Sequence, residues 1–143
     1  MNTGDLRKRI LLALDTARKE SADRRQTRDA ASEAYDRFLT EIAGPLVKQA
    51  ASVLAAEQQR FIAVTPAGSV RLASEHSPQT FLEFQLDTTG ARPQVLGRVS
   101  VPRGRDGVVV EERPIAPGKA IGDLVEDDVA KFLVAEIPKL VVR

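Results

Sequence analysis

The chain contains no cysteine and no tryptophan, and its only histidine is His76. The absence of cysteine excludes disulfides, thiol nucleophiles and thiolate metal sites. A single imidazole cannot form a multi-histidine metal site within one chain, so Asp and Glu remain as the plentiful ligands, and we expect no metal and no cofactor. Aromatic residues make up 4% of the chain, which leaves little for stacking against nucleic-acid bases.

Neither sign of charge dominates, and no long hydrophobic run is present. Lys and Arg number 21 against 20 Asp and Glu, so the formal net charge of +1 does not favour a nucleic-acid or anionic membrane partner. The apolar run at residues 10–14 is too short for a signal-peptide core or a membrane span. We therefore expect a cytoplasmic protein without membrane contact, and 143 residues suit a single domain.

Residues 4–20 have the pattern of an amphipathic helix. Leu6, Ile10 and Leu14 recur every four residues and so share one face. Residues 18–29 are mostly charged and include no large apolar side chain, no Gly and no Pro. They form either an exposed loop between two helices or the solvated middle of one long helix. The lack of a helix breaker favours the continuous helix.

The apolar stripe resumes after residue 30 and is interrupted by Gly44 and Pro45. Proline removes a backbone donor, so we expect a kink or two abutting helices there. An amphipathic helix is marginal in water unless its apolar face is covered. This predicts a homodimer through the N-terminal helices, or an arm that binds another protein. The residues expected in that interface are Leu6, Ile10, Leu14, Tyr35 and Phe38.

From Phe61 onward the apolar period changes to two, which is typical of β-strands. Short turns rich in Gly and Pro join five such runs, which predicts an antiparallel meander. The strands are expected at 61–65, 69–74, 80–88, 93–101 and 108–113. Glu83 and Gln85 are expected on the exposed face. The side chains expected on the buried face are Leu82, Phe84, Leu86, Val99 and Val101.

A last helix is predicted over residues 123–137. Asp123 is expected to cap it, with Glu126 three residues later, and Pro138 is expected to kink or stop it. Packing of this helix on the sheet completes an α+β fold. The single domain then consists of a long helix or helical hairpin (1–59), a five-stranded antiparallel meander (60–113), and a loop with the closing helix (114–143).

Three arginines are the candidate ligand-binding residues. Arg103 and Arg105 flank Gly104 in the turn before the fifth strand, and Arg98 precedes them on the fourth. Guanidinium groups on a flexible turn can hold a phosphate or a carboxylate. The alternative interpretation is a solubilising turn without a ligand.

Two other polar stretches contain residue types used in catalysis. Glu83 and Gln85 alternate on a strand, which resembles the metal-binding strand of restriction-type nucleases, but the upstream strand lacks the Asp that this chemistry needs. The turn from Ser74 to Ser77 contains His76, yet the members of a catalytic triad usually converge from separate elements. A solvated strand face and a polar turn explain both stretches more simply, so we lean towards a protein that is not an enzyme.

No motif in the chain indicates an activity. In outline, the helical arm, meander and closing helix resemble type III secretion chaperones and helix-grip ligand carriers, and likeness of fold alone does not transfer function. We expect a binding or interaction module that is homodimeric through its N-terminal helices. The alternatives are a ligand-binding or hydrolytic domain with a pocket between the sheet and the C-terminal helix, and a weak nucleic-acid binder that uses the basic arm.

Overall fold

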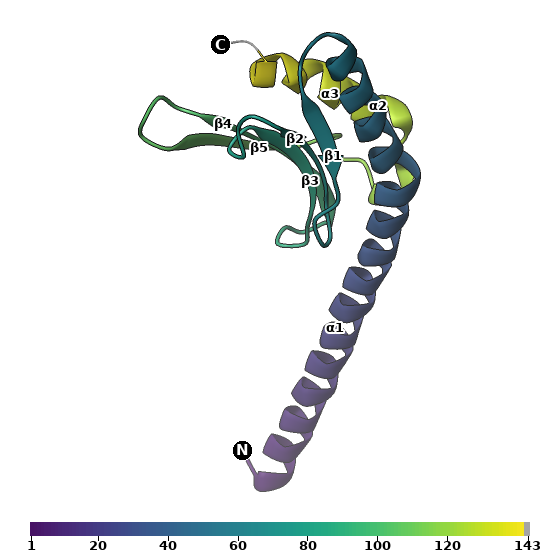
Figure 1. The fold of residues 1–143 in the computed structure, drawn as a ribbon. Coiled ribbons are helices and arrows are strands. Elements are labelled where there is room, and N and C mark those ends of the chain that lie inside the picture. Colours follow the sequence, from purple (N-terminus) through teal and green to yellow (C-terminus); the bar gives the residue numbers. More distant parts are fainter. Residues whose placement is uncertain (142–143) are drawn as a thin grey trace.

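The computed structural model describes residues 1–141 and shows a long helix that projects from a sheet-and-helix body (Figure 1). We call residues 3–30 the arm and residues 31–141 the head. The elements are α1 (Thr3–Phe38), the π-helical turn η1 (Leu39–Ala43), α2 (Gly44–Ala56), β1 (Phe61–Val64), β2 (Val70–Ser74), β3 (Phe81–Asp87), β4 (Gln94–Pro102), β5 (Val108–Pro114), the 3₁₀ turn η2 (Ile121–Asp123) and α3 (Glu126–Val141).

Helix α1 runs without interruption through the charged stretch 18–29, which confirms the continuous helix over the loop. Its start is fixed by Asn2, whose side-chain oxygen accepts a hydrogen bond from the backbone N–H of Asp5 at 2.8 Å. Such a cap satisfies one of the free amide groups at the helix N-terminus. Every residue before Ala31 is exposed. Only the last turn of the arm, at Thr27 and Ala30, borders head residues such as Pro93.

The predicted interruption at Gly44 and Pro45 is present as the π-helical turn η1. The backbone N–H of Gly44 donates to the carbonyl of Leu39, five residues earlier, which is the π-helical spacing. A Cβ atom at position 44 would lie 2.8 Å from that carbonyl oxygen, so only glycine allows the close approach. Pro45 then occupies the first turn of α2, where its missing N–H needs no partner.

The sheet is an antiparallel meander in the order β1-β2-β3-β4-β5. Its five strands agree with the expected ranges to within one residue at each end. The β4–β5 hairpin extends beyond the helices at one side of the head (Figure 1). The α+β architecture predicted from the sequence is therefore confirmed.

One face of the sheet packs against α2 and α3 and forms the core. Leu82, Phe84 and Val99 are buried there as predicted, whereas Leu86 and Val101 are only half-buried at its margin. Phe132 of α3 lies directly over β4: a Cβ atom at Gly97 would stand 2.1 Å from its ring. The space between the sheet and α3 is thus filled by aromatic rings at this point.

Helix α3 differs from the prediction at both ends. Asp123 lies in η2 and does not cap α3; instead the Asp128 carboxylate accepts a hydrogen bond from the backbone N–H of Val125 at 2.9 Å. Pro138 does not stop the helix, which continues to Val141. Leu140, beyond the proline, is 2% exposed, and its burial in the core stabilises this last turn.

A buried carboxylate ties α3 to the edge of the sheet. Glu136 is 5% exposed, and its carboxylate accepts a hydrogen bond from Nε of Arg113 in β5 at 2.9 Å. Lys139 Nζ approaches its other oxygen at 2.9 Å. Burial alone would raise the pKa of Glu136, but the hydrogen bonds from Lys139 and Arg113 hold that pKa below its usual value. The charge pair thus fixes α3 against β5.

Candidate functional site

A row of alternating charge crosses the face of the sheet that lies opposite the core. The antiparallel register pairs Arg71 of β2 with Glu83 of β3, Glu83 with Arg98 of β4, and Arg98 with Glu112 of β5. Neighbouring strands lie about 4.8 Å apart, so each of these side chains is within reach of the next. Short turns between the strands set this register, and the register brings the four charges into line.

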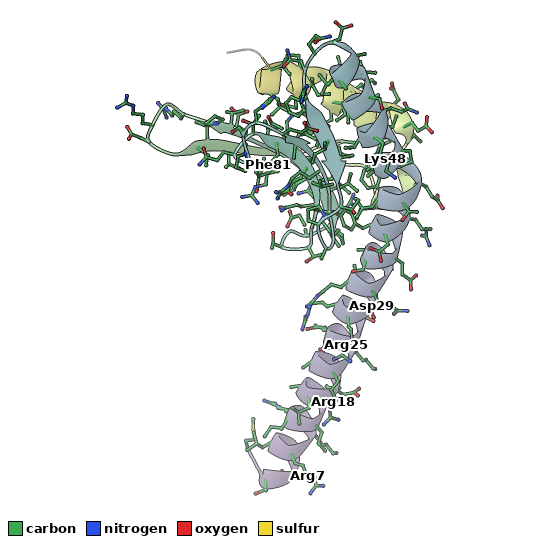
Figure 2. The ribbon with its side chains drawn as sticks, viewed as in Figure 1. Arg7, Arg18, Arg25, Asp29, Lys48 and Phe81 are labelled. Carbon is green, nitrogen blue, oxygen red and sulfur yellow. The ribbon has the colours of Figure 1, made fainter. Side chains whose placement is uncertain are left out.

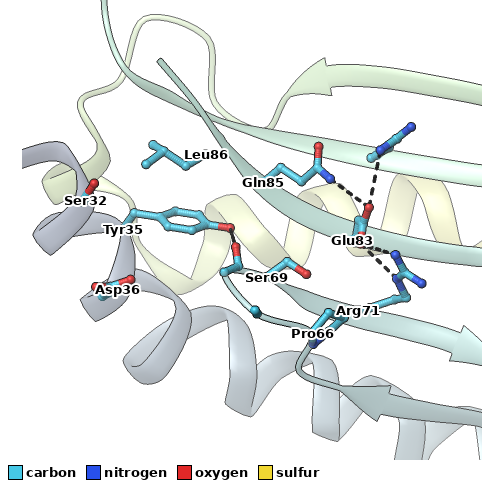
Figure 3. A pocket seen from close by; sticks show the side chains of 12 residues that line it. Ser32, Tyr35, Asp36, Pro66, Ser69, Arg71, Glu83, Gln85 and Leu86 are labelled. Carbon is cyan, nitrogen blue, oxygen red and sulfur yellow. Dashed lines mark hydrogen bonds and ion pairs between the residues drawn. The ribbon is translucent and has the colours of Figure 1, made fainter. Parts of the chain in front are cut away.

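Glu83 is the centre of this row, and it is 2% exposed. Arg71 donates to one carboxylate oxygen through Nε at 2.9 Å and Nη2 at 2.8 Å. The other oxygen receives the Gln85 side-chain amide at 3.0 Å and lies 3.7 Å from Arg98 Nη1 (Figure 3). These partners satisfy a carboxylate that would be costly to bury alone.

The exposed placement predicted for Glu83 and Gln85 was wrong. The alternation itself was correct, because Leu82 and Phe84 point to the core and Glu83 points away from it. The opposite face is covered, however, by the long side chains of Arg71 and Arg98, which close over Glu83. Gln85 is half-buried, and its side-chain amide donates to Glu83.

Beside this cluster lies an open pocket of about 640 Å³, between the head end of α1, the β1–β2 turn and strands β2 to β4 (Figure 3). Tyr35 of α1 forms one wall, and its hydroxyl lies 2.8 Å from the Gly68 carbonyl and 3.0 Å from the Phe84 carbonyl. Burial, followed by the negative charges of Glu83 and Asp36, raises the pKa of Tyr35 above its usual value. Tyr35 therefore stays protonated and acts as a donor.

Of the three arginines predicted to bind a ligand, only Arg98 lines this pocket. Its side chain is 34% exposed and Arg71 is 31% exposed, so part of each guanidinium can meet a ligand. Arg103 and Arg105 are exposed in the β4–β5 turn, about five residues or roughly 16 Å along the strand direction from Arg98. The structure does not bring the three together.

Arg71 was not predicted as a site residue. Its position on β2 is unremarkable by itself. Only the pairing of β2 with β3 places it opposite Glu83. Charges of alternating sign at paired positions of neighbouring strands would have indicated this site. Finding those pairs requires the register of the strands, which depends on turn geometry.

Side chains of the polar turn between β2 and β3 form hydrogen bonds within the turn. Ser74 Oγ accepts from the His76 backbone N–H at 3.2 Å, and Thr80 Oγ1 donates to Ser77 Oγ at 3.1 Å. These bonds stabilise a turn. Among residues 1–141, no group of three or more His, Asp or Glu side chains is placed to hold a metal ion.

The residues predicted for an interface fall into two groups. Leu6, Ile10 and Leu14 lie on the arm and are 49%, 50% and 46% exposed. Tyr35 and Phe38 are 4% and 3% exposed, with both side chains packed into the core of their own head. Tyr35 and Phe38 were predicted to contact another chain. This prediction is corrected, because the core of their own head already covers both side chains.

Compared with known proteins, the chain matches no family model, no curated protein and no solved structure. Within the described part of the chain, no helix is long and apolar enough to cross a membrane. The arm and the Glu83 pocket are thus the two features from which a function can be argued.

Proposed function

We propose that the protein is a non-enzymatic binding module that forms a homodimer through its arm. The observation that carries this proposal is that the outer part of the continuous helix α1, which bears an apolar face, is exposed and projects away from the head (Figure 1). Leu6, Ile10, Leu11 and Leu14 gather on this part of the arm, between 46% and 54% exposed. Most of the stability of a helix in a protein comes from packing of its apolar face. An uncovered face of this kind favours association.

Because basic and acidic residues on the arm nearly balance, a second copy of the arm is favoured as its partner over a strongly charged molecule. Eight basic residues stand against five acidic ones in residues 3–30, and eight minus five leaves a surplus of only three. Lys19 and Asp15 already pair within the arm at 3.4 Å. A two-fold contact is self-complementary, so each apolar face meets the same face of its copy.

The contact is expected to be modest in strength. Each of the four side chains is already half covered by its own helix, so burying the rest in two arms is worth about 6–12 kcal/mol before association costs. Those costs are at least about 4 kcal/mol. The difference is at most about 8 kcal/mol, which corresponds to dissociation constants of about 1 µM or weaker. Since Tyr35 and Phe38 do not contribute, the dimer is weaker than their inclusion would predict.

Deletion of residues 1–20 tests the proposal. The shortened chain keeps Ala31, Tyr35 and Phe38, through which α1 packs on the head, so its unfolding temperature should stay within a few degrees of that of the full chain. It should be a monomer by light scattering at every concentration at which the full chain dimerises. If the shortened and full chains associate equally, the arm is not the interface.

A second function is supported by the pocket beside Glu83: binding of a small carboxylate or phosphate. Arg71 and Arg98 converge on Glu83 from two strands, which holds both guanidiniums in place while about a third of each stays exposed. Fixed guanidinium groups bind such anions well because their donors match two acceptor oxygens.

Titration with inorganic phosphate at constant ionic strength, followed by amide NMR shifts, tests this second function. The largest shifts should appear in β2 to β4 around Arg71 and Arg98, and Arg98→Gln should weaken binding at least tenfold. Arg103→Gln is the matched control, because Arg103 lies in the turn that follows β4 and outside the pocket. Equal effects of the two substitutions, or no shifts at all, would rule the site out.

A further inference from the structure

We infer that the two arms pair antiparallel over residues 3–17, so that the two heads lie at opposite ends of the dimer. This inference rests on the proposed homodimer and adds its geometry. It follows from the distribution of side chains along one face of α1, whose 36 residues form a single unbroken helix.

The face that carries the apolar stripe changes character along the arm. At 100° per residue, Leu6, Ile10 and Ala17 lie within a narrow sector, and Leu14 lies at its margin. The same sector continues into Arg24 and Arg28 before it reaches the head. The apolar part of the face is therefore confined to the outer half of the arm, and the basic part lies next to the head.

Parallel pairing would bring each basic residue against its own copy. Helix axes in contact lie about 8–10 Å apart, so Arg24 and Arg28 would each face an identical charge within about one screening length. Arg18 and Arg25, which project from the arm in Figure 2, would add to the repulsion beside them. Like charges held together in an interface disfavour that arrangement.

Antiparallel pairing avoids this repulsion. With Ile10 at the two-fold axis, Leu6 of one arm lies level with Leu14 of the other, and Thr3 lies level with Ala17. The second helix ends there, because α1 begins at Thr3. Arg24 and Arg28 then remain in water, beyond the end of the second arm.

This arrangement also gives the charged stretch 18–29 a role. From Ala17 to Ala31, where the head begins, the helix rises about 21 Å. The end of the second arm therefore stops well short of the head. The stretch acts as a solvated spacer, which accounts for a helix that has neither a breaker nor a large apolar side chain there.

Disulfide cross-linking tests the orientation, and a chain without cysteine gives a clean background. Ile10→Cys should cross-link with itself, because Ile10 lies on the axis. Leu6→Cys and Leu14→Cys should each cross-link poorly alone and well when mixed. Trypsin distinguishes the products, because residue 6 lies in a peptide that ends at Arg7 and residue 14 in one that ends at Arg18.

A spin label at Arg24→Cys provides a second measurement that leaves the apolar contact intact. In the antiparallel dimer the two labelled positions lie about 42 Å apart, because 28 residues of helical rise separate them along the common axis. In a parallel dimer they lie about 10–20 Å apart.

The outcomes separate the two levels of the proposal. A mixed disulfide between positions 6 and 14 and a distance near 42 Å support the antiparallel dimer. If Leu6→Cys cross-links with itself and the spin labels at position 24 lie about 10–20 Å apart, the orientation is wrong but the dimer is still supported. A failure of Ile10→Cys to cross-link, with no coupling between labels at several hundred micromolar, overturns the dimer itself.

Discussion

Replacing Phe84 by alanine should lower the free energy of unfolding by about 3–5 kcal/mol, the range for a fully buried phenylalanine. Phe84 is 0% exposed and lies where α1, the sheet and α3 meet. Its ring packs edge-on against Phe38 at 6.0 Å between centroids and against Phe132 at 5.6 Å. The cavity left by the substitution cannot close easily, because these two neighbours belong to different helices, α1 and α3.

Urea denaturation followed by circular dichroism measures this effect, and Phe81→Ala is the matched control. Phe81 is three residues earlier on the same strand but lies on the opposite face, half-buried, with the Arg71 guanidinium 4.0 Å from its ring centre. Its truncation should cost about 1–2 kcal/mol. A loss below 1 kcal/mol for Phe84→Ala, or an equal loss for the two variants, would contradict the described core.

The second large effect is expected on association. Ile10→Glu should weaken the homodimer at least a hundredfold, because it places two carboxylates opposite one another at the centre of the apolar contact. Ile10 is exposed, so the head should unfold as before. Sedimentation equilibrium gives the dissociation constant, and thermal unfolding confirms the intact head.

Leu12→Glu is the control for that substitution. Leu12 is 68% exposed and lies two residues from Ile10, about 160° around the helix and away from the stripe. The same change of charge at the same distance from the tip should leave dimerisation nearly unchanged. If Leu12→Glu and Ile10→Glu weaken the dimer equally, the stripe is not the contact face and general charge repulsion explains the loss.

The architecture could be predicted from the sequence because both periodicities are strong. Alternation over Phe81–Asp87 and Gln94–Pro102 set the strands and the buried face, and the lack of a breaker in 18–29 predicted the unbroken helix. These are local properties. They depend on neighbouring residues in the chain and on the pleat or turn that those residues form.

The candidate site could not be predicted, because it depends on contacts between distant residues. Glu83 is buried on a face that alternation alone marks as exposed, and the arginines that cover it come from two other strands. Tyr35 was placed in an interface to add to the burial of Leu6, Ile10 and Leu14, whereas its own head covers it. Pro138 was expected to kink or stop α3; the helix does not stop there, because the burial of Leu140 outweighs the lost hydrogen bond.

Sedimentation equilibrium of the unmodified chain between about 5 and 500 µM tests the central claim most directly, at concentrations within the range of dissociation constants estimated above. The exposed arm predicts a reversible shift from the 15.6 kDa monomer towards twice that mass as concentration rises. Removal of residues 1–20 should abolish the shift. A single species of monomer mass across the whole range would contradict self-association through the arm.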